Sequence, residues 1–337
     1  MDSTITLNHN YSTTRLIIKD KSKNQNNHKH ELETTLFLSE SEERQGEGGL
    51  RTQGYFKMSY DKKPLVSIVT VVFNGEAYLE ETIQSVINQT YDNVEYIIID
   101  GGSTDGTLEI IKKYENQIDY WVSEKDTGMY NALNKGFSCA QGEYLGWINS
   151  DDTLFTNALQ DVQSVFIKFS DVKWLTGRKV IKNKYSQYKQ IGCFQSYYQN
   201  LIKSGFYRGD GLWFIMQEGT FWRRTLFEKI GFKLNEDLKL AADFELWTRF
   251  AKYTPLYSVN SLLGSFRMHE NQLSSDREKY SQECNSIKFS GFIKKIFHTF
   301  RYFIFFYSIL DKKNKIEFNA DGPVKATKFL NLEGRLS

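Results

Sequence analysis

Residues 66–107 decide the fold, and they read VSIVTVVFNGEAYLEETIQSVINQTYDNVEYIIIDGGSTDGT. Residues 65–73 are a continuous apolar, β-branched run, which is typical of a strand covered on both faces. Residues 94–100 are a second such run, ending in an aspartate. Between the two strands, apolar residues recur at helical spacing and predict one buried helical stripe, formed by Leu79, Ile83, Val86 and Ile87.

The same alternation of strand and helix continues to residue 153. Helical patterns cover residues 107–116 and 127–142, the second with Met129, Leu133, Gly136 and Phe137 facing inward. Strand patterns cover residues 118–124 and 143–149. Short connections between alternating strands and helices predict an α/β fold, with a Rossmann-like, mostly parallel sheet flanked by helices.

The composition narrows the classes of function. The 43 basic and 41 acidic residues give a net charge of +2, which offers no general case for binding nucleic acid. Three cysteines stand in no metal or redox spacing, so we expect a reducing compartment. We find neither a signal-peptide pattern nor an uncharged apolar stretch near 18 residues, and we expect a cytoplasmic protein.

The chain divides into three regions by composition. Residues 1–63 are polar and predict a disordered arm. Residues 64–275 predict one domain, with halves at 64–153 and 154–275. Residues 276–337 form an extension, in which 287–310 predict a helix with an aromatic face and basic flanks. Such a helix suits peripheral contact with a membrane, and packing on the domain or in a dimer is the alternative.

Polar residues follow the ends of the predicted strands. Asn74, which is also a candidate helix cap, follows the first strand, Asp100 ends the second, and Asp126 and the pair Asp151–Asp152 follow the third and fourth. Ligands of open parallel sheets bind beyond the carboxyl ends of the strands. Two adjacent carboxylates repel each other unless a cation lies between them, and Mg²⁺ or Mn²⁺ prefers oxygen ligands. The pair therefore predicts a metal site.

The turn after the first strand excludes two common phosphate sites. It reads FNGEAYLEE, which is neither a Gly-x-Gly-x-x-Gly loop nor a P-loop with its Lys and Ser or Thr. A nucleotide bound here would be held by its base, its ribose and a metal ion.

Together with EKDTGMYNALNKGFSCAQGEYLGWINSDD at 124–152, these motifs resemble the family-2 glycosyltransferases of the GT-A fold. The resemblance is close over residues 65–153 and looser to about 275. The family transfers a sugar from a nucleoside-diphosphate sugar to an acceptor, usually with inversion. The resemblance therefore implies a metal-dependent glycosyltransferase that uses Mn²⁺ or Mg²⁺.

The resemblance also implies roles for individual residues. Asp152 is the expected metal ligand, with His269 as a further candidate near the diphosphate or metal. Asp151 is expected at the ribose or as a partner of a metal ligand. Asp100 is expected at the donor base with Phe73 against it. The remaining donor-side candidates are Asn74, Ser103 and Asp126. Asn131 departs from the family pattern, in which many relatives carry Asp.

The second half offers a base for the acceptor hydroxyl. The resemblance points to Asp243 in LKLAADFELWTRF, with Glu245 in reserve. The alternative is a helix cap at Asp243 with Glu245 in the first turn. On the acceptor side we expect Gln217, Glu218 and Trp222, the last stacking on a sugar ring or lying in the core.

The resulting hypothesis is transfer from a nucleotide sugar, with UDP favoured by the resemblance, to a glycan or lipid-linked acceptor. The product would belong to a surface polysaccharide or glycolipid, made at the inner face of the cell membrane. Two alternatives stay open. A non-catalytic sugar-nucleotide or glycan-binding protein would not need Asp243, and a nucleotidyltransferase would need a basic, glycine-rich loop where FNGEAYLEE stands.

Overall fold

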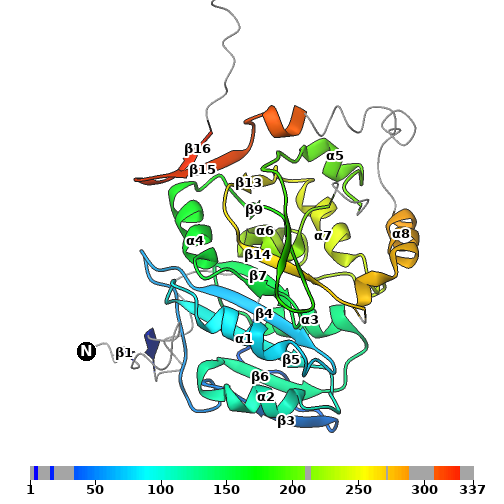
Figure 1. The fold of residues 1–337 in the computed structure, drawn as a ribbon. Coiled ribbons are helices and arrows are strands. Elements are labelled where there is room, and N and C mark those ends of the chain that lie inside the picture. The colour runs from blue at the N-terminus through cyan, green and yellow to red at the C-terminus, as the bar shows by residue number, and fades with distance from the viewer. Residues whose placement is uncertain are drawn as a thin grey trace, which may run out of the picture.

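A computed structural model describes residues 4–6, 16–18, 34–208, 214–270, 272–287 and 307–326. Its centre is a sheet of ten strands, four of which, β6, β5, β4 and β7, are parallel neighbours (Figure 1). From edge to edge the strands are β16 (Gly322–Lys325), β15 (Lys315–Asn319), β13 (Tyr257–Val259), β9 (Trp174–Thr176), β12 (Thr220–Arg223), β7 (Tyr144–Asn149), β4 (Val66–Val72), β5 (Val94–Asp100), β6 (Tyr120–Glu124) and β3 (Arg44–Gly48).

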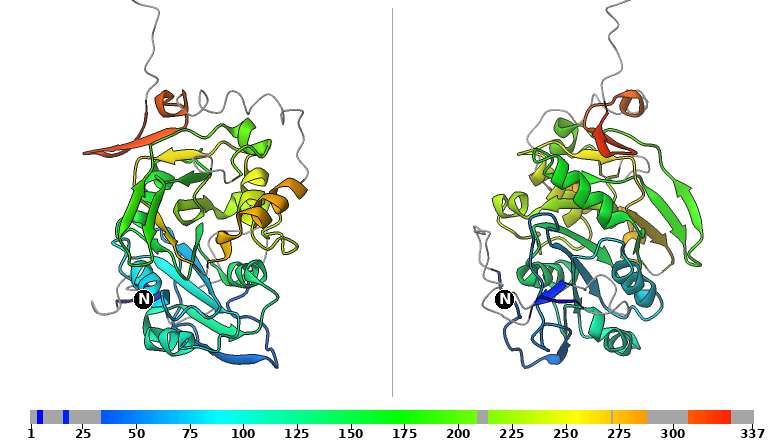
Figure 2. Two further views of the ribbon diagram at one scale, coloured as in Figure 1. Left: turned by 45° about the vertical axis from the view of Figure 1, so that its right-hand side comes forward. Right: turned by 90° about the vertical axis from the view of Figure 1, so that its left-hand side faces the viewer.

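Helices cover both faces of this sheet (Figure 2). One apolar cluster joins alternate residues of β4 and β5 to α3 (Met129–Cys139), α6 (Arg224–Lys229) and α7 (Ala242–Phe250). The second joins the other face to α1 (Leu79–Ile87), α2 (Thr107–Lys113) and α4 (Ala158–Lys168). Gly136 lets α3 approach the sheet, because a Cβ there would lie 2.4 Å from Val69 Cγ1.

Smaller elements complete the described part. A second sheet has the order β11 (Tyr188–Ile191), β10 (Val180–Asn183), β14 (Gly264–Met268) and β8 (Thr153–Leu154). A separate strand pair joins β1 (Thr4–Thr6) and β2 (Leu16–Ile18). The remaining helices are α5 (Gln199–Lys203), α8 (Arg277–Ser286) and the short 3₁₀ turns η3 (Glu115–Gln117), η4 (Gln217–Gly219) and η5 (Leu273–Ser275).

The four strands and three helices predicted between residues 65 and 149 are confirmed. The buried stripe of α1 is the predicted one, at Leu79, Ile83, Val86 and Ile87. In α3, Leu133, Gly136 and Phe137 are buried as predicted, and Met129 is half-buried. The predicted α/β class with a Rossmann-like sheet is therefore correct.

The predicted disordered arm is wrong for residues 34–63, because this segment packs on the sheet. It adds β3 to the edge of the sheet, antiparallel to β6. Arg51 and Lys57 are buried in ion pairs with Glu95 and Asp119. Strands β3 and β15 carry the sheet past both predicted domain boundaries, at 64 and 275.

The predicted amphipathic helix at 287–310 falls largely outside the described residues, which resume at 307 after residue 287. Peripheral membrane contact through this segment stays a prediction. Within the described ranges, none of the helices has the length and apolar character needed to cross a membrane.

Candidate active site

The loops after β4 and β5 are tied together through Asn74. Its backbone N–H donates to Ser103 Oγ at 2.8 Å, and its Oδ1 accepts from the backbone N–H of Thr104 at 2.9 Å. Asn74 has a φ of 50°, a left-handed conformation that asparagine tolerates. The predicted helix cap at Asn74 is wrong, because α1 begins at Leu79 and the Asn74 side chain is bound by the neighbouring loop.

Asp100 lies beneath this junction. Its Oδ2 accepts from the backbone N–H of Ser103 at 3.1 Å and from Ser123 Oγ at 2.6 Å, and its Oδ1 accepts from the Ser103 hydroxyl. The side chain has no exposed surface. In this arrangement Asp100 and Ser103 fix the loop at 101–106, and direct contact of either with a donor stays a prediction.

Phe73 and Asp126 are more accessible. Phe73 follows β4 directly and is 64% exposed, so its ring is available to a planar ligand. Asp126 is half-buried after β6, and its Oδ1 accepts from the backbone N–H of Gly128 at 2.7 Å. A Cβ at Gly101 would lie 2.5 Å from Asp126 Oδ2, so the glycine lets the loops after β5 and β6 meet.

The acid pair after β7 is held by the segment that contains β14. Asp151 Oδ2 lies 2.9 Å from His269 Nε2. Asp152 Oδ1 accepts from the backbone N–H of Arg267 at 2.7 Å, and its Oδ2 accepts from Asn149 Nδ2 at 3.3 Å. Burial, followed by the charges of Asp151 and Glu218, raises the pKa of Asp152 well above its ordinary value. The structure thus brings together the acids and the histidine that the sequence predicted for a metal.

Two buried cations lie next to the acid pair, and neither was among the predicted site residues. The Arg267 guanidinium donates to the Asp151 carbonyl at 2.6 Å and pairs with Glu81. Lys182 Nζ donates to Thr153 Oγ1 at 2.8 Å and pairs with Glu81 at 3.0 Å. The position of Arg267, two residues before His269, was a signal, whereas nothing in the sequence marked Lys182 or Glu81.

Glu218 and Gln217 form a buried turn, η4, beside the acid pair. Burial, followed by the charges of Asp243 and Asp151, raises the pKa of Glu218 to about 7, against the opposing effect of its own backbone N–H. Gln217 Nε2 donates to the Trp147 carbonyl at 2.6 Å. Glu218 Oε2 is buried without a hydrogen-bond partner among the described residues. Their contact with an acceptor stays a prediction.

Asp243 is the second residue of α7, and it does not cap the helix. The N-cap residue is Ala241, whose side chain has no group that could accept a hydrogen bond. Asp243 is 7% exposed, and its Oδ1 has no hydrogen-bond partner in the part of the chain that the structure describes. Burial raises its pKa to about 7 against the effect of two backbone N–H groups of its own turn. A carboxyl group with this pKa can accept a proton at neutral pH.

Glu245, the reserve candidate, has a structural role. Its Oε2 accepts from Arg249 Nε at 2.9 Å, one turn along the same helix. Such an i, i+4 pair stabilises a helix. Of the two predicted acids, only Asp243 has a buried carboxylate oxygen without a hydrogen-bond partner among the described residues.

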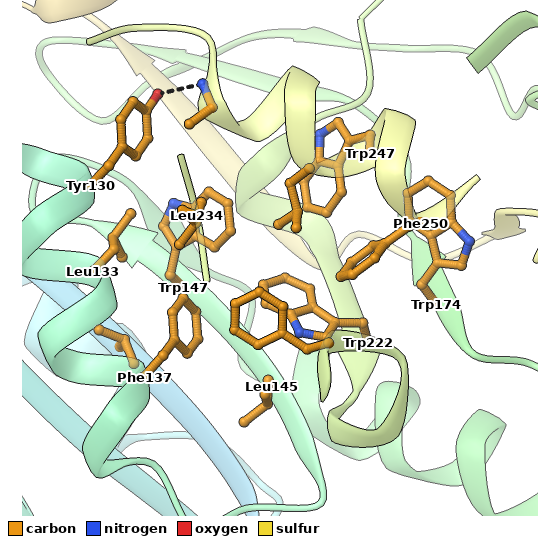
Figure 3. Close-up of a cluster of buried hydrophobic side chains, with 14 of the residues drawn as sticks. Tyr130, Leu133, Phe137, Leu145, Trp147, Trp174, Trp222, Leu234, Trp247 and Phe250 are labelled. Carbon is orange, nitrogen blue, oxygen red and sulfur yellow. Dashed lines mark hydrogen bonds between the residues drawn. The ribbon is translucent and has the colours of Figure 1, made fainter. Parts of the chain in front are cut away.

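The predicted sugar contact at Trp222 is wrong. Trp222 has no exposed surface and lies in an aromatic cluster between the sheet and α7 (Figure 3). Its ring centroid is 5.5 Å from that of Trp147 and 5.9 Å from that of Trp247. Its cross-strand neighbours, Leu145 of β7 and Trp174 of β9, belong to the same buried cluster, so this side chain points into the covered face of the sheet.

The donor set after β7 fits a divalent cation completed by a ligand. Among the described residues, no group of three or more His, Cys, Asp or Glu side chains is arranged to hold a metal ion. An ion held by one or two carboxylates and by phosphate oxygens does not need a full protein cage. Asp151 and His269 present ligand atoms 2.9 Å apart, and Asp152 Oδ2 has one long hydrogen bond that an ion can replace.

Comparison with known proteins assigns the family. The sequence model described as Glycosyl transferase family 2 matches residues 67–231. An uncharacterized glycosyltransferase of Rickettsia typhi is 30% identical over 236 residues, which are 69% of this chain and 73% of that protein. The chain belongs to the family 2 glycosyltransferases. This glycosyltransferase is also similar to TuaG of Bacillus subtilis, with 41% identity over 93 residues. The matched residues are 27% of this glycosyltransferase and 37% of TuaG. TuaG is named as a candidate glycosyltransferase of teichuronic acid biosynthesis.

Solved structures show the same fold. S. aureus TarS 1-349 in complex with UDP-GlcNAc has a TM-score of 0.52 at 18% identity, over 63% of this glycosyltransferase and 61% of that chain. The mannosyltransferase PcManGT of Pyrobaculum calidifontis, in complex with GDP-Man and Mn²⁺, has a TM-score of 0.50 at 18% identity, over 65% and 61%. This glycosyltransferase therefore spans less than two thirds of these solved chains. Their similarity to it confirms the predicted GT-A-type fold.

Proposed function

We propose that this glycosyltransferase moves a sugar from a nucleoside-diphosphate sugar to a hydroxyl group of a glycan or lipid-linked acceptor, with inversion. The observation that carries this proposal is Asp243, a buried acid with a pKa of about 7 and an oxygen without a partner among the described residues. It belongs to the same electrostatic group as the acid pair after β7, because its charge and that of Asp151 both raise the pKa of Glu218, where burial is the larger cause.

Asp243 would act as the base. The acceptor oxygen attacks C1 of the sugar, the bond from C1 to the diphosphate oxygen breaks, and the acceptor proton passes to the Asp243 carboxylate. Attack from the side opposite the leaving group inverts C1. Because the pKa of Asp243 is about 7, a large fraction of this carboxyl is ionised at neutral pH and can still hold the proton after transfer.

The donor would lie along the loops that follow the strands. Phe73 offers an exposed ring for the base, and the loop fixed by Asn74, Asp100 and Ser103 forms the floor. Asp151, Asp152 and His269 would hold Mn²⁺ or Mg²⁺, which supplies positive charge to stabilise the departing diphosphate. Mn²⁺ occurs beside GDP-Man in the PcManGT structure, and this supports the proposal.

The substrates are a narrower proposal. TarS was solved with UDP-GlcNAc, which supports a UDP-sugar as the donor. The name of TuaG supports a surface polysaccharide or glycolipid as the product. An acceptor of this kind fits work at the inner face of the cell membrane.

Release of nucleoside diphosphate from a panel of UDP-, GDP- and dTDP-sugars tests the function. Water can take the place of the acceptor, so the acceptor need not be known. We expect release that requires Mn²⁺ or Mg²⁺, stops with chelator and is lost in Asp152→Ala. Asp92→Ala, a matched control at the opposite end of the sheet, should release at the wild-type rate. Donor binding by calorimetry without release from any donor would favour the non-catalytic binding protein.

A further inference from the structure

Helix α8 lies beside the first turn of α7 (Figure 1). The Glu283 carboxylate accepts from three consecutive backbone N–H groups there, at 3.0 Å from Lys239, 2.8 Å from Leu240 and 3.0 Å from Ala241. Cys284, the next residue, packs against Ala241 and Phe244 in a small apolar cluster. Glu283 thus holds the three residues that lead into α7, which lie 42 to 44 positions earlier in the sequence.

Glu283 and Asp243 bind different parts of the start of α7. An acid in the first turn of a helix is normally stabilised in its charged form by free N–H groups and the helix dipole. Glu283 binds the N–H groups of residues 239–241, before the helix, and the Asp243 carboxylate accepts from its own N–H and that of Phe244. The Tyr130 hydroxyl accepts from the N–H of Ala242 at 3.1 Å (Figure 3). Asp243 follows directly, and its Oδ1 has no partner in the described part of the chain.

We propose that Glu283 is a positioning residue for Asp243, which fixes the backbone that leads into α7 and places its own charge within reach of the Asp243 carboxyl. The inference rests on the proposed role of Asp243 as the base. It makes α8, outside the matched family region at 67–231, a working part of the site.

The groups that face Asp243 come from three elements. Glu283, Tyr280 and Cys284 belong to α8, Tyr130 to α3 and Glu218 to η4. Burial raises the pKa of Cys284 to about 12 and the pKa values of Tyr130 and Tyr280 well above 10, so these three stay neutral below pH 9. The charge of Glu283 adds to burial in raising the pKa of Asp243. Removing that charge should therefore lower the pKa of Asp243.

A double-mutant cycle tests this without a substrate. The free energy of unfolding in urea is measured from pH 4 to 9 for the wild type, Asp243→Asn, Glu283→Gln and the double variant. The stability difference due to Asp243 falls as the pH rises and levels off at the folded-state pKa. With Glu283 present it should level off near pH 7. In the Glu283→Gln background it should do so about half a pH unit or more lower.

The control is Glu278→Gln, an exposed position of the same helix, which should leave the curve unchanged. If the stability difference levels off at the same pH with Glu283 and with Gln at position 283, the proposal is overturned, because a purely structural role of Glu283 would not move it. If Glu283→Gln does not fold, Glu283→Asp is used instead, because it moves the charge away by one methylene.

In the Glu283→Asp background, the stability difference due to Asp243 should level off at a lower pH than with Glu283, by a smaller shift. Levelling-off at the same pH as with Glu283 would equally overturn the proposal. The proposed function is judged separately, by release of nucleoside diphosphate.

Discussion

The two ends of the parallel strands bury charges in different ways. At the amino ends, the buried Arg51 is paired with the buried Glu95, and Lys57 Nζ lies 2.6 Å from Asp119 Oδ2. At the carboxyl ends, burial raises the pKa values of Glu218 and Asp243 to about 7, and neither has an ion pair with a cation among the described residues.

This difference separates structural charges from functional ones. A buried charge is costly unless an opposite charge or several hydrogen bonds compensate it. The pairs at the amino ends meet that condition and fasten residues 34–63 to the sheet. Glu218 and Asp243, at the carboxyl ends, lack an opposite charge of this kind among the described residues, and strongly shifted pKa values in such clusters are typical of catalytic sites. We therefore expect substitutions at one end to change stability and at the other to change activity.

Asp243→Asn should have the largest effect on activity. The variant keeps the shape of the side chain and removes the proton acceptor, so donor turnover should fall by about 10²- to 10⁴-fold. Nucleoside-diphosphate release at saturating donor measures this. Glu245→Gln, two residues along the same helix, is the control and should retain most of the activity. Turnover of Asp243→Asn within tenfold of the wild type would remove it as the base.

Arg51→Met should have the largest effect on stability. It leaves the Glu95 carboxylate buried without its cation, so the free energy of unfolding should fall by about 3–5 kcal/mol. Donor affinity of the folded variant should not change. Urea unfolding and calorimetry measure the two quantities. Lys63→Met, which breaks an exposed pair with Asp92, should cost less than about 1 kcal/mol. A similar loss in both variants would contradict the distinction.

Glu218→Gln should stabilise the protein at high pH. The folded-state pKa of about 7 lies above the ordinary value of 4.5, so Glu218 is favoured in its protonated form and destabilises the fold as the pH rises through this range. The variant should therefore be more stable by about 1–3 kcal/mol at pH 8.5. The advantage should be absent at pH 4. A stability difference that does not depend on pH would show that Glu218 is compensated in the wild type.

Phe73→Ala should have the smallest effect. The side chain is 64% exposed, so the free energy of unfolding should change by less than about 0.5 kcal/mol. Loss of a ring contact with the donor base should weaken donor binding by about 3- to 10-fold, as measured by calorimetry. Tyr253→Ala, an exposed aromatic after α7, is the control and should leave donor binding unchanged. Equal donor affinity in both variants would place the base elsewhere.

The sequence predicted the part of the fold that depends on local patterns. Continuous β-branched runs marked β4 and β5, and the helical stripe marked α1, because both depend on the period of buried residues. Residues 34–63 have no such period, and their attachment depends on ion pairs with residues 44 and 62 positions away, which no local pattern reveals.

The site was predictable to the same extent. The resemblance selected Asp151, Asp152 and Asp243 as candidates, because their positions follow from motifs. The sugar contact at Trp222 is wrong, because the sequence pattern of an aromatic residue is the same in a core and at a sugar site. The helix cap at Asn74 is wrong, because the partner of this side chain lies 30 residues away in the next loop. Lys182 and Glu283 reach the site through tertiary contacts that depend on the folded chain.

The pH dependence of donor turnover tests most directly whether the unpaired acids serve transfer. With Mn²⁺ present, turnover should rise about tenfold per pH unit below pH 7 and level off above it, following ionisation of Asp243. The same rise of turnover with pH should persist in Glu218→Gln, which removes the other acid with a pKa of about 7. A rate that is flat or falls between pH 5.5 and 8.5 would contradict a base with this pKa.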